Sequence, residues 1–230
     1  MKTIGLIGGI TWYSTLDYYR LLNEMVNEKL GGAHSAKIIL NSLEFAIIRE
    51  LTEKLDWDGL AKIMCTAARG IETAGAGCLL IGANTMHNIA DEVQAAINIP
   101  VIHIADAVAD SIQQKQLKKV ALLGTRYTML LDFYKDKLLK KGIGVIIPSA
   151  GDIEFINHAI YNEFGKGLFG AETKQKFLTI LDTLIGEGAQ GAVFGCTEIP
   201  ILLKQEDCPV PVFDTTLIHV AAAVEFALNG

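Results

Sequence analysis

The sequence predicts an α/β protein built from two pseudo-symmetric halves, each a mainly parallel sheet flanked by helices. Short apolar runs alternate with helical patterns along the whole chain, which is typical of parallel sheets covered on both faces. The second observation is an internal repeat of strands that end in a small-residue turn. Ala83 follows Gly8 by 75 residues, and Cys196 follows Gly124 by 72 residues, so the same two turns recur at nearly equal spacing.

The individual elements follow from this alternation. The apolar runs predict strands at residues 2–8, 37–43, 77–82, 100–104, 118–124, 143–147, 191–195 and 210–213. Helical spacing of apolar residues predicts helices at 14–30, 57–74, 87–97, 105–116, 128–141, 151–164, 171–187 and 215–228. Gly75 and Gly142 stand where a helix should end, Pro100 opens a strand, and Asp214 is suited to cap the last helix.

The two halves are predicted to be joined by two crossovers. Ile104-Ala105-Asp106 leads into a helix near residue 105, and the chain returns near residue 213. We therefore expect a first half of residues 1–105 plus 214–230 and a second half of residues 106–213. The active site is expected in the cleft between them, because ligands of such sheets bind outside the carboxyl ends of the strands.

Composition excludes several classes of function. The 230 residues are 50% hydrophobic and 20% charged, enough for a full core, and the net charge of -6 comes without basic runs. We therefore expect neither nucleic acid nor a membrane surface as partner. Gly8-Gly9 interrupts the N-terminal apolar run, and no apolar stretch reaches the roughly 20 residues of a membrane span, so a cytoplasmic protein is expected.

Four loops at predicted strand ends carry the candidate binding groups: residues 8–14, 82–87, 124–128 and 195–200. Gly8-Gly9 followed by Ser14-Thr15, and the run from Gly124 to Thr128, can present backbone N–H groups to an anion. Neither matches a dinucleotide or nucleoside-triphosphate loop. The anion expected here is a carboxylate.

Cys196 is the cysteine with a candidate chemical role. It directly follows a predicted central strand and precedes a helix start with Thr197 as a suitable cap, where the helix dipole favours a thiolate. The alternative is a small buried hydrophobe, which is what we expect of Cys65, Cys78 and Cys208. The four cysteines lack paired metal-ligand spacing, so free thiols and no metal site are expected.

Five motifs in order carry a family resemblance. They are Gly8-Gly9 with Trp12, Ser14 and Thr15; Asn84-Thr85-Met86-His87; Gly124-Thr125-Arg126-Tyr127-Thr128-Met129; Phe194-Gly195-Cys196-Thr197-Glu198; and Phe213-Asp214-Thr215. Together they resemble the aspartate/glutamate racemase family from residue 3 to about residue 226. The resemblance implies a cofactor-independent amino-acid racemase, a homodimer, with two cysteines as its acid/base pair. Cys196 matches the second-half cysteine, and the first-half cysteine, which precedes Asn-Thr, is Ala83 here.

The chemistry explains the two thiols. The α-hydrogen of an amino acid is weakly acidic, so one face needs a base, the other a proton donor, and the carboxylate needs hydrogen-bond donors. The resemblance implies substrate-binding groups at Gly9, Ile10, Arg49, Asn84, Thr85, Thr125, Tyr127, Thr128, Lys166, Thr197 and Glu198. Arg49 and Lys166 resemble the basic groups that read the distal carboxylate, with solvated surface charges as the alternative. Glu198 orients the ammonium group or caps a helix, and His87 and His103 are expected to be structural.

Ala83 leaves the activity open, because alanine carries no proton. It is a substitution made to trap substrate, or it marks a natural one-thiol racemase in which water or Thr85 supplies the second proton. A third interpretation is a single-cysteine decarboxylase or isomerase of the same superfamily, and a fourth is a non-catalytic amino-acid-binding module. We favour the racemase scaffold first and the decarboxylase or isomerase second. The binding module ranks third, because it has no need of an activated thiol.

Overall fold

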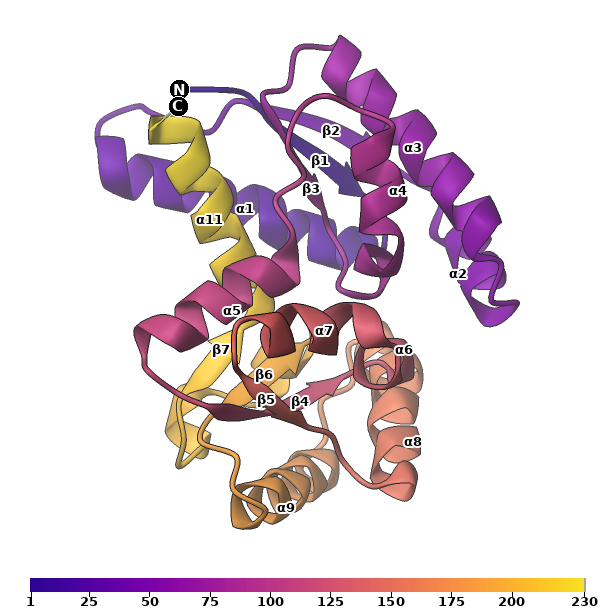
Figure 1. Cartoon of the computed structure of the whole chain (residues 1–230), viewed down its shortest axis with the longest axis vertical. Coiled ribbons are helices and arrows are strands. Elements are labelled where there is room, and N and C mark those ends of the chain that lie inside the picture. The colour runs from indigo at the N-terminus through magenta and orange to yellow at the C-terminus, as the bar shows by residue number, and fades with distance from the viewer. Residues whose placement is uncertain (230) are drawn as a thin grey trace. The chain divides into compact units, whose positions relative to one another are not determined.

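The computed structural model of the chain describes residues 1–229, and two compact units are distinguished in it (Figure 1). The first unit contains residues Met1–His103 and the segment from His219 onward, and the second contains Ile104–Ile218. Each unit has its own parallel sheet with helices around it. The predicted α/β class with two parallel sheets is therefore confirmed.

The first unit is a three-stranded sheet between two helical layers. The strands are β1 (Ile4–Gly8), β2 (Ile38–Ser42) and β3 (Cys78–Ile81), in the order β2-β1-β3. The helices are α1 (Trp12–Leu30), α2 (Phe45–Glu53), α3 (Trp57–Thr73), η1 (Thr85–Ile89), α4 (Ala90–Ala95) and most of α11 (Thr215–Asn229).

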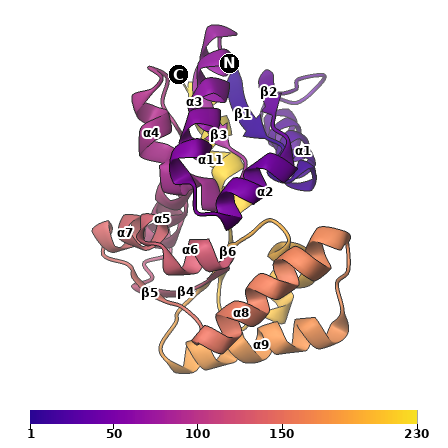
Figure 2. The ribbon, with the colours of Figure 1, turned by 90° about the vertical axis from the view of Figure 1, so that its right-hand side faces the viewer.

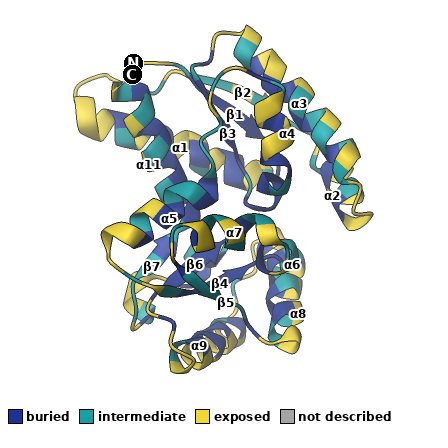
Figure 3. Cartoon of the chain, viewed as in Figure 1, coloured by how far each residue is buried: buried dark blue, intermediate teal, exposed yellow. Residues whose placement is uncertain are grey.

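Alternation along the strands divides the first unit's core between the two faces of its sheet. Leu6 and Leu80 pack with side chains of α1 and α11, whereas Ile7 and Ile81 pack with side chains of α3 and α4. Every residue of β1 and β3 is buried, and Figure 3 shows helices around them whose outer sides are exposed. The carboxyl ends of β1 and β3 are thereby held at one edge of the sheet.

The second unit has four parallel strands in the order β5-β4-β6-β7. They are β4 (Lys119–Gly124), β5 (Gly144–Ile146), β6 (Ala192–Gly195) and β7 (Val212–Asp214). The helices are α5 (Ile104–Gln114), α6 (Arg126–Leu130), α7 (Asp132–Lys140), α8 (Ala150–His158), η2 (Ala159–Glu163), η3 (Phe164–Lys166), α9 (Ala171–Gly186), α10 (Ile199–Leu202) and η4 (Gln205–Asp207).

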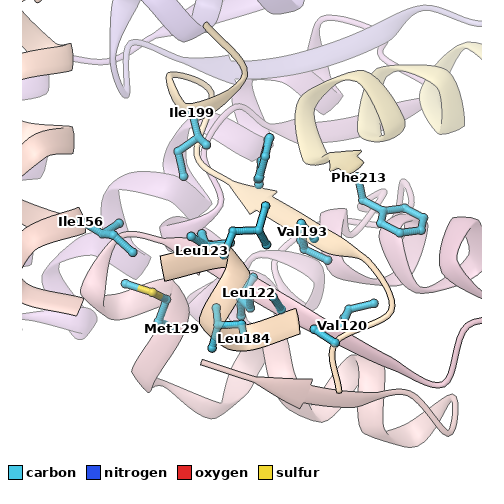
Figure 4. Close-up of a cluster of buried hydrophobic side chains, with 14 of the residues drawn as sticks. Val120, Leu122, Leu123, Met129, Ile156, Leu184, Val193, Ile199 and Phe213 are labelled. Carbon is cyan, nitrogen blue, oxygen red and sulfur yellow. The ribbon is translucent and has the colours of Figure 1, made fainter. Parts of the chain in front are cut away.

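The second unit's core lies on the strands β4 and β6. Figure 4 shows Leu122, Leu123 and Val193 among side chains from the surrounding helices. Figure 2 shows α8 beside α9, and the Phe155 and Phe177 ring centroids are 6.1 Å apart there. This packing fixes the ends of β4 and β6, from which two of the candidate loops leave.

Three sequence expectations differ from the structure. The strand predicted at 100–104 is wrong: Val101 makes only an isolated bridge to Leu79, because α5 already begins at Ile104. Helix α2 was not predicted; it is capped by Glu44, whose carboxylate accepts the Ala46 N–H at 3.2 Å. The helix predicted at 128–141 is two helices, because Leu131 has extended backbone.

None of the helices within residues 1–229 is long and apolar enough to cross a membrane. In the same range, no three or more His, Cys, Asp or Glu side chains are grouped so that they could hold a metal ion.

Candidate active site

The second unit brings three strand ends together. Gly124 pairs with Gly195, and Phe194 pairs with Asp214, so the residues that follow these strands leave the same edge of the sheet. Two glycines allow the strand ends to approach. A Cβ on Gly124 would lie 2.9 Å from the Gly195 carbonyl oxygen, and a Cβ on Gly195 would lie 3.1 Å from Thr128. Larger residues would push apart the loops that carry Thr125 and Cys196.

The loop after β4 forms a helix cap. Thr125 Oγ1 accepts the Thr128 N–H at 3.3 Å and lies 3.2 Å from Thr128 Oγ1, and both threonines are buried. The Arg126 N–H donates to Asn157 Oδ1 at 3.0 Å, and the Arg126 guanidinium pairs with Glu154 at 2.5 Å. Tyr127 lies half-buried on the same turn. This cap holds two hydroxyl groups at the sheet edge where β6 also ends.

Cys196, Thr197 and Glu198 form a local hydrogen-bonded group directly after β6. The Cys196 thiol donates to Glu198 Oε2 at 2.9 Å, and the Thr197 hydroxyl donates to the same oxygen at 2.7 Å. All three residues are half-buried. One carboxylate oxygen therefore orients both the thiol and the hydroxyl.

The surroundings of Cys196 in this structure oppose the thiolate that its position after the strand favours. Burial raises the pKa of the Cys196 thiol well above its ordinary value, and the negative charge of Glu198 and its acceptance of the thiol hydrogen raise that pKa further. The following helix α10 begins only at Ile199 and has four residues, so it offers little dipole to oppose these effects. These surroundings favour a neutral thiol that donates to Glu198.

Glu198→Gln should therefore lower the pKa of the Cys196 thiol. Removing the charge leaves burial as the main cause of the raised pKa, and we expect alkylation of Cys196 by iodoacetamide at pH 8 to be about ten-fold faster or more. The rate is measured by peptide mass spectrometry. Glu206→Gln, on an exposed residue of the same unit, is the control. An unchanged or slower rate in Glu198→Gln would contradict the assignment.

In the first unit, the loop after β1 is built around Gly9. Gly9 has a φ of +80°, and a Cβ there would lie 2.1 Å from the Leu43 carbonyl oxygen, so only glycine fits. Its N–H donates to Thr15 Oγ1 at 2.8 Å, and the Thr15 hydroxyl donates to the Thr11 carbonyl at 3.0 Å. The Ile10 side chain is buried in the core, which leaves its backbone for any binding role.

The loop after β3 carries Ala83. The Gly82 N–H donates to the Ile7 carbonyl, and the Ala83 N–H donates to the Ile81 carbonyl, each at 2.8 Å. Ala83 is half-buried against the core, and the next two residues, Asn84 and Thr85, are 6% and 8% exposed. The backbone of residue 83 is thus bound to the end of its own strand.

The imidazole rings of His87, His103 and His219 form a cluster beside Ala83, and the sequence identified only some of its members. His87 Nδ1 lies 2.9 Å from the Ala83 carbonyl oxygen, and the His87 ring contacts the rings of His103 and His219. His219 is fully buried, with its two nitrogens 2.8 Å from the Tyr18 hydroxyl and 2.6 Å from the Ile102 carbonyl oxygen. The motif Asn84-Thr85-Met86-His87 contained one of these residues, whereas nothing local marked Tyr18 or His219.

His219 should make the first unit sensitive to acid. Burial lowers the pKa of His219 to about 3, against about 6.5 in an unfolded chain. Between these pH values the unfolded chain binds a proton that the folded chain does not, so the free energy of unfolding falls with falling pH, by up to about 1.4 kcal/mol per pH unit. The sensitivity is lost in His219→Gln, which keeps an N–H donor but does not titrate.

Urea unfolding at pH 7, 6 and 5 measures this difference. Both tryptophans, Trp12 and Trp57, lie in the first unit, so their fluorescence follows the unit that holds His219. Equal pH dependence in the parent chain and in His219→Gln would show that His219 does not cause the acid sensitivity.

Arg49 and Lys166 do not belong to the four strand-end loops. Arg49 is exposed on α2, where its Nε donates to Glu53 at 2.8 Å, and Lys166 is exposed on η3. Asp214 accepts the N–H groups of Thr216 and Leu217 at 2.9 and 3.2 Å, which confirms its predicted cap of the last helix.

Comparisons with known proteins agree with this architecture. A candidate Asp/Glu racemase from Yersinia pestis is 46% identical, with a TM-score of 0.94, over 99% of this chain and 100% of that chain. An aspartate racemase homologue from Pyrococcus horikoshii OT3 is 37% identical, with a TM-score of 0.87, over the same shares of the two chains. The broad specificity amino-acid racemase RacX of Bacillus subtilis (strain 168) is 24% identical over 165 residues, 70% of each protein.

A family model settles the relationship. The model of the Asp/Glu/hydantoin racemase family matches residues 7–223, which include all four strand-end loops described above. The chain therefore belongs to the Asp/Glu/hydantoin racemase family.

Proposed function

We propose that this protein acts at the α-carbon of aspartate or glutamate without a cofactor, with Cys196 as a proton carrier. The observation that carries the proposal is the hydrogen bond of 2.9 Å from the Cys196 thiol to Glu198 at the carboxyl end of β6. A thiol with a raised pKa can protonate a carbanion, which is one half of a racemisation. Family membership supports an amino acid as the substrate.

The substrate itself would turn the thiol into a base. An amino acid brings an ammonium group, and a positive charge near Glu198 would offset the negative charge that raises the pKa of Cys196. Glu198 then has two tasks in this proposal: it binds the ammonium group as a carboxylate, and it gives up its hydrogen bond to the Cys196 thiol, whose proton passes to solvent water. The Cys196 thiolate would then form only when substrate binds, and the thiol would stay neutral in the free protein.

The carboxylates of the substrate need hydrogen-bond donors. We propose the hydroxyls of Thr125, Thr128 and Thr197 in the second unit, and Asn84 and Thr85 in the first, as groups that bind the α-carboxylate. Backbone groups at Ile10 and Tyr127 complete the set that the family resemblance implies, and Gly9, whose own N–H is bound to Thr15 Oγ1, shapes the loop that presents Ile10. Arg49 and Lys166 remain candidates for the distal carboxylate, because both are exposed cations with long, flexible side chains.

Residue 83 decides whether the reaction stops at exchange of the α-hydrogen or proceeds to inversion of the α-carbon. The family resemblance assigns one thiol to this position of the first unit, and alanine cannot carry a proton. We therefore propose that Cys196 exchanges the α-hydrogen of one enantiomer, and that inversion is slow because water or Thr85 must supply the second proton. The loss of one member of an acid/base pair costs about 10² to 10⁴ in rate.

The test is deuterium incorporation from heavy water at the α-carbon of L- and D-aspartate and L- and D-glutamate, with optical rotation recorded in parallel. Exchange in one enantiomer without inversion is the expected result. Inversion of both enantiomers at a high rate would show a second efficient proton donor. Absence of exchange in all four amino acids would overturn the proposal.

A second candidate is a single-thiol decarboxylase of the same superfamily. The observation in its favour is that Ala83 packs against the first-unit core, which gives this position a small apolar surface in place of a proton carrier. A decarboxylase needs only one face of its carbanion to be protonated, and Cys196 suffices for that. Release of carbon dioxide from an α-substituted malonate, with no exchange in the four amino acids, would favour this function.

A further inference from the structure

The buried cluster beside residue 83 joins four parts of the first unit. His87 comes from η1, His103 from the segment before α5, His219 from α11 and Tyr18 from α1. The His87 ring centroid lies 4.7 Å from that of His103 and 5.4 Å from that of His219, both edge to face. His87 is 2% exposed and His219 is fully buried. Rings packed in this way have little freedom to turn.

The acceptors around the cluster decide which nitrogens carry hydrogen. A carbonyl oxygen can only accept, so His87 Nδ1 donates to the Ala83 carbonyl at 2.9 Å. By the same reasoning, His219 Nε2 donates to the Ile102 carbonyl at 2.6 Å. In a neutral ring His219 Nδ1 is then an acceptor, and the Tyr18 hydroxyl donates to it at 2.8 Å. Both rings are thus held in defined and opposite tautomers.

The hydrogen bond from His87 is the second of two that hold the backbone of residue 83. The N–H of Ala83 is bound to the Ile81 carbonyl at 2.8 Å, and its carbonyl is bound to His87. The backbone is therefore held on both sides of the Cα atom. The direction in which a side chain leaves position 83 is set by these two hydrogen bonds.

We propose that His87 is a positioning residue for the side chain at position 83, with His103 and His219 packed to hold its ring. This inference rests on the proposed function, in which the family resemblance assigns a proton carrier to position 83 and alanine leaves that place without one. Proton transfer depends steeply on placement, and a shift of about 1 Å can cost about 100-fold in rate. His87 acts through the backbone of residue 83 and carries no proton of the reaction itself.

The experiment uses the chain with Ala83→Cys and adds His87→Leu, His87→Asn or His87→Gln. Asparagine places its amide N–H where Nδ1 stands, so it can keep the hydrogen bond to the carbonyl of residue 83. Glutamine places its N–H nearer the position of Nε2, and leucine has no donor. His34→Leu, on an exposed histidine of the same unit, is the matched control.

The first readout is the ratio of inversion to α-deuterium exchange for the enantiomer that Cys196 deprotonates. Exchange through Cys196 needs no second carrier, whereas inversion needs the thiol introduced by Ala83→Cys. We expect His87→Leu to lower this ratio about 10- to 100-fold and His87→Asn to restore it to within about three-fold. A general folding defect would lower inversion and exchange together and leave the ratio unchanged.

The second readout does not depend on activity. Iodoacetamide alkylation of the introduced thiol is compared with that of Cys196 in the same samples by peptide mass spectrometry. We expect His87→Leu and His87→Gln to change this ratio at least about three-fold, and His87→Asn and His34→Leu to leave it unchanged. A ratio unaffected by every His87 variant would overturn the positioning role. If Ala83→Cys exchanges no amino acid, the proposed function fails and the alkylation ratio still decides the inference.

Discussion

Ala83→Cys is expected to raise the rate of inversion of aspartate or glutamate by about 10²- to 10⁴-fold. The substitution adds a single sulfur atom at a half-buried position whose backbone is already held by Ile81 and His87. A thiol there would take or give the proton on the face of the α-carbon that Cys196 does not serve. The gain is measured as the initial rate of optical rotation from each enantiomer.

Two controls separate proton transfer from a change of shape at position 83. Serine at position 83 is close to cysteine in size, but its hydroxyl has a far higher pKa than a thiol. We therefore expect the inversion rate of Ala83→Ser to stay within about ten-fold of that of the parent chain. Valine at position 83 is about as bulky as cysteine but has no ionisable proton, so Ala83→Val should not raise the inversion rate. Equal rates in the cysteine and valine variants would show that position 83 is not the place of the second proton carrier.

Cys196→Ala is expected to lower α-deuterium exchange by at least about 10³-fold in both the parent chain and the Ala83→Cys chain. In the proposed function Cys196 carries the proton on one face of the α-carbon, and Glu198, which accepts the hydrogen of its thiol at 2.9 Å, does not stand in the same place. The exchange is followed by mass spectrometry in heavy water. Cys196→Ser keeps the hydrogen bond to Glu198 but should lose most of the activity, because the hydroxyl is a much weaker acid than the thiol.

Cys65→Ala is the matched control for the loss of a thiol. Cys65 is half-buried in the first unit, with its sulfur 3.5 Å from the Glu92 carbonyl oxygen, and it lies on α3 away from the strand ends. Its loss should change exchange by less than about two-fold. Retention of exchange in Cys196→Ala would show that another group removes the α-hydrogen.

The strand ends were predictable because their signals are local. Gly8, Gly124 and Gly195 each close an apolar run, and a run of that kind followed by a small-residue turn indicates a parallel strand that leads into a helix. The candidate loops could be found in the same way, and so could the cap formed by Asp214. Helix α2, which lies between β2 and α3, was harder to predict, because it has only nine residues and no strong start signal except Glu44.

The histidine cluster was not predictable, because its members share no local pattern. His219 follows His87 by 132 residues, and Tyr18 precedes both on a different helix. Only the packing of α1, η1 and α11 in one unit brings their rings together. The sequence assigned His87 a structural part, and its hydrogen bond to Ala83 could not be read from a motif.

The sequence by itself determined the α/β class, the repeated strand–turn–helix elements and the position of the single strand-end thiol, because each depends on the order of neighbouring residues. The tertiary structure alone decided the protonation of that thiol and the partners of the imidazoles. Desolvation and the field of Glu198 raise the pKa of Cys196 after the chain has folded around it. Glu198 is only two residues from Cys196 in the sequence, but its placement 2.9 Å from the sulfur and the packing of Cys196 against the second-unit core exist only in the folded chain.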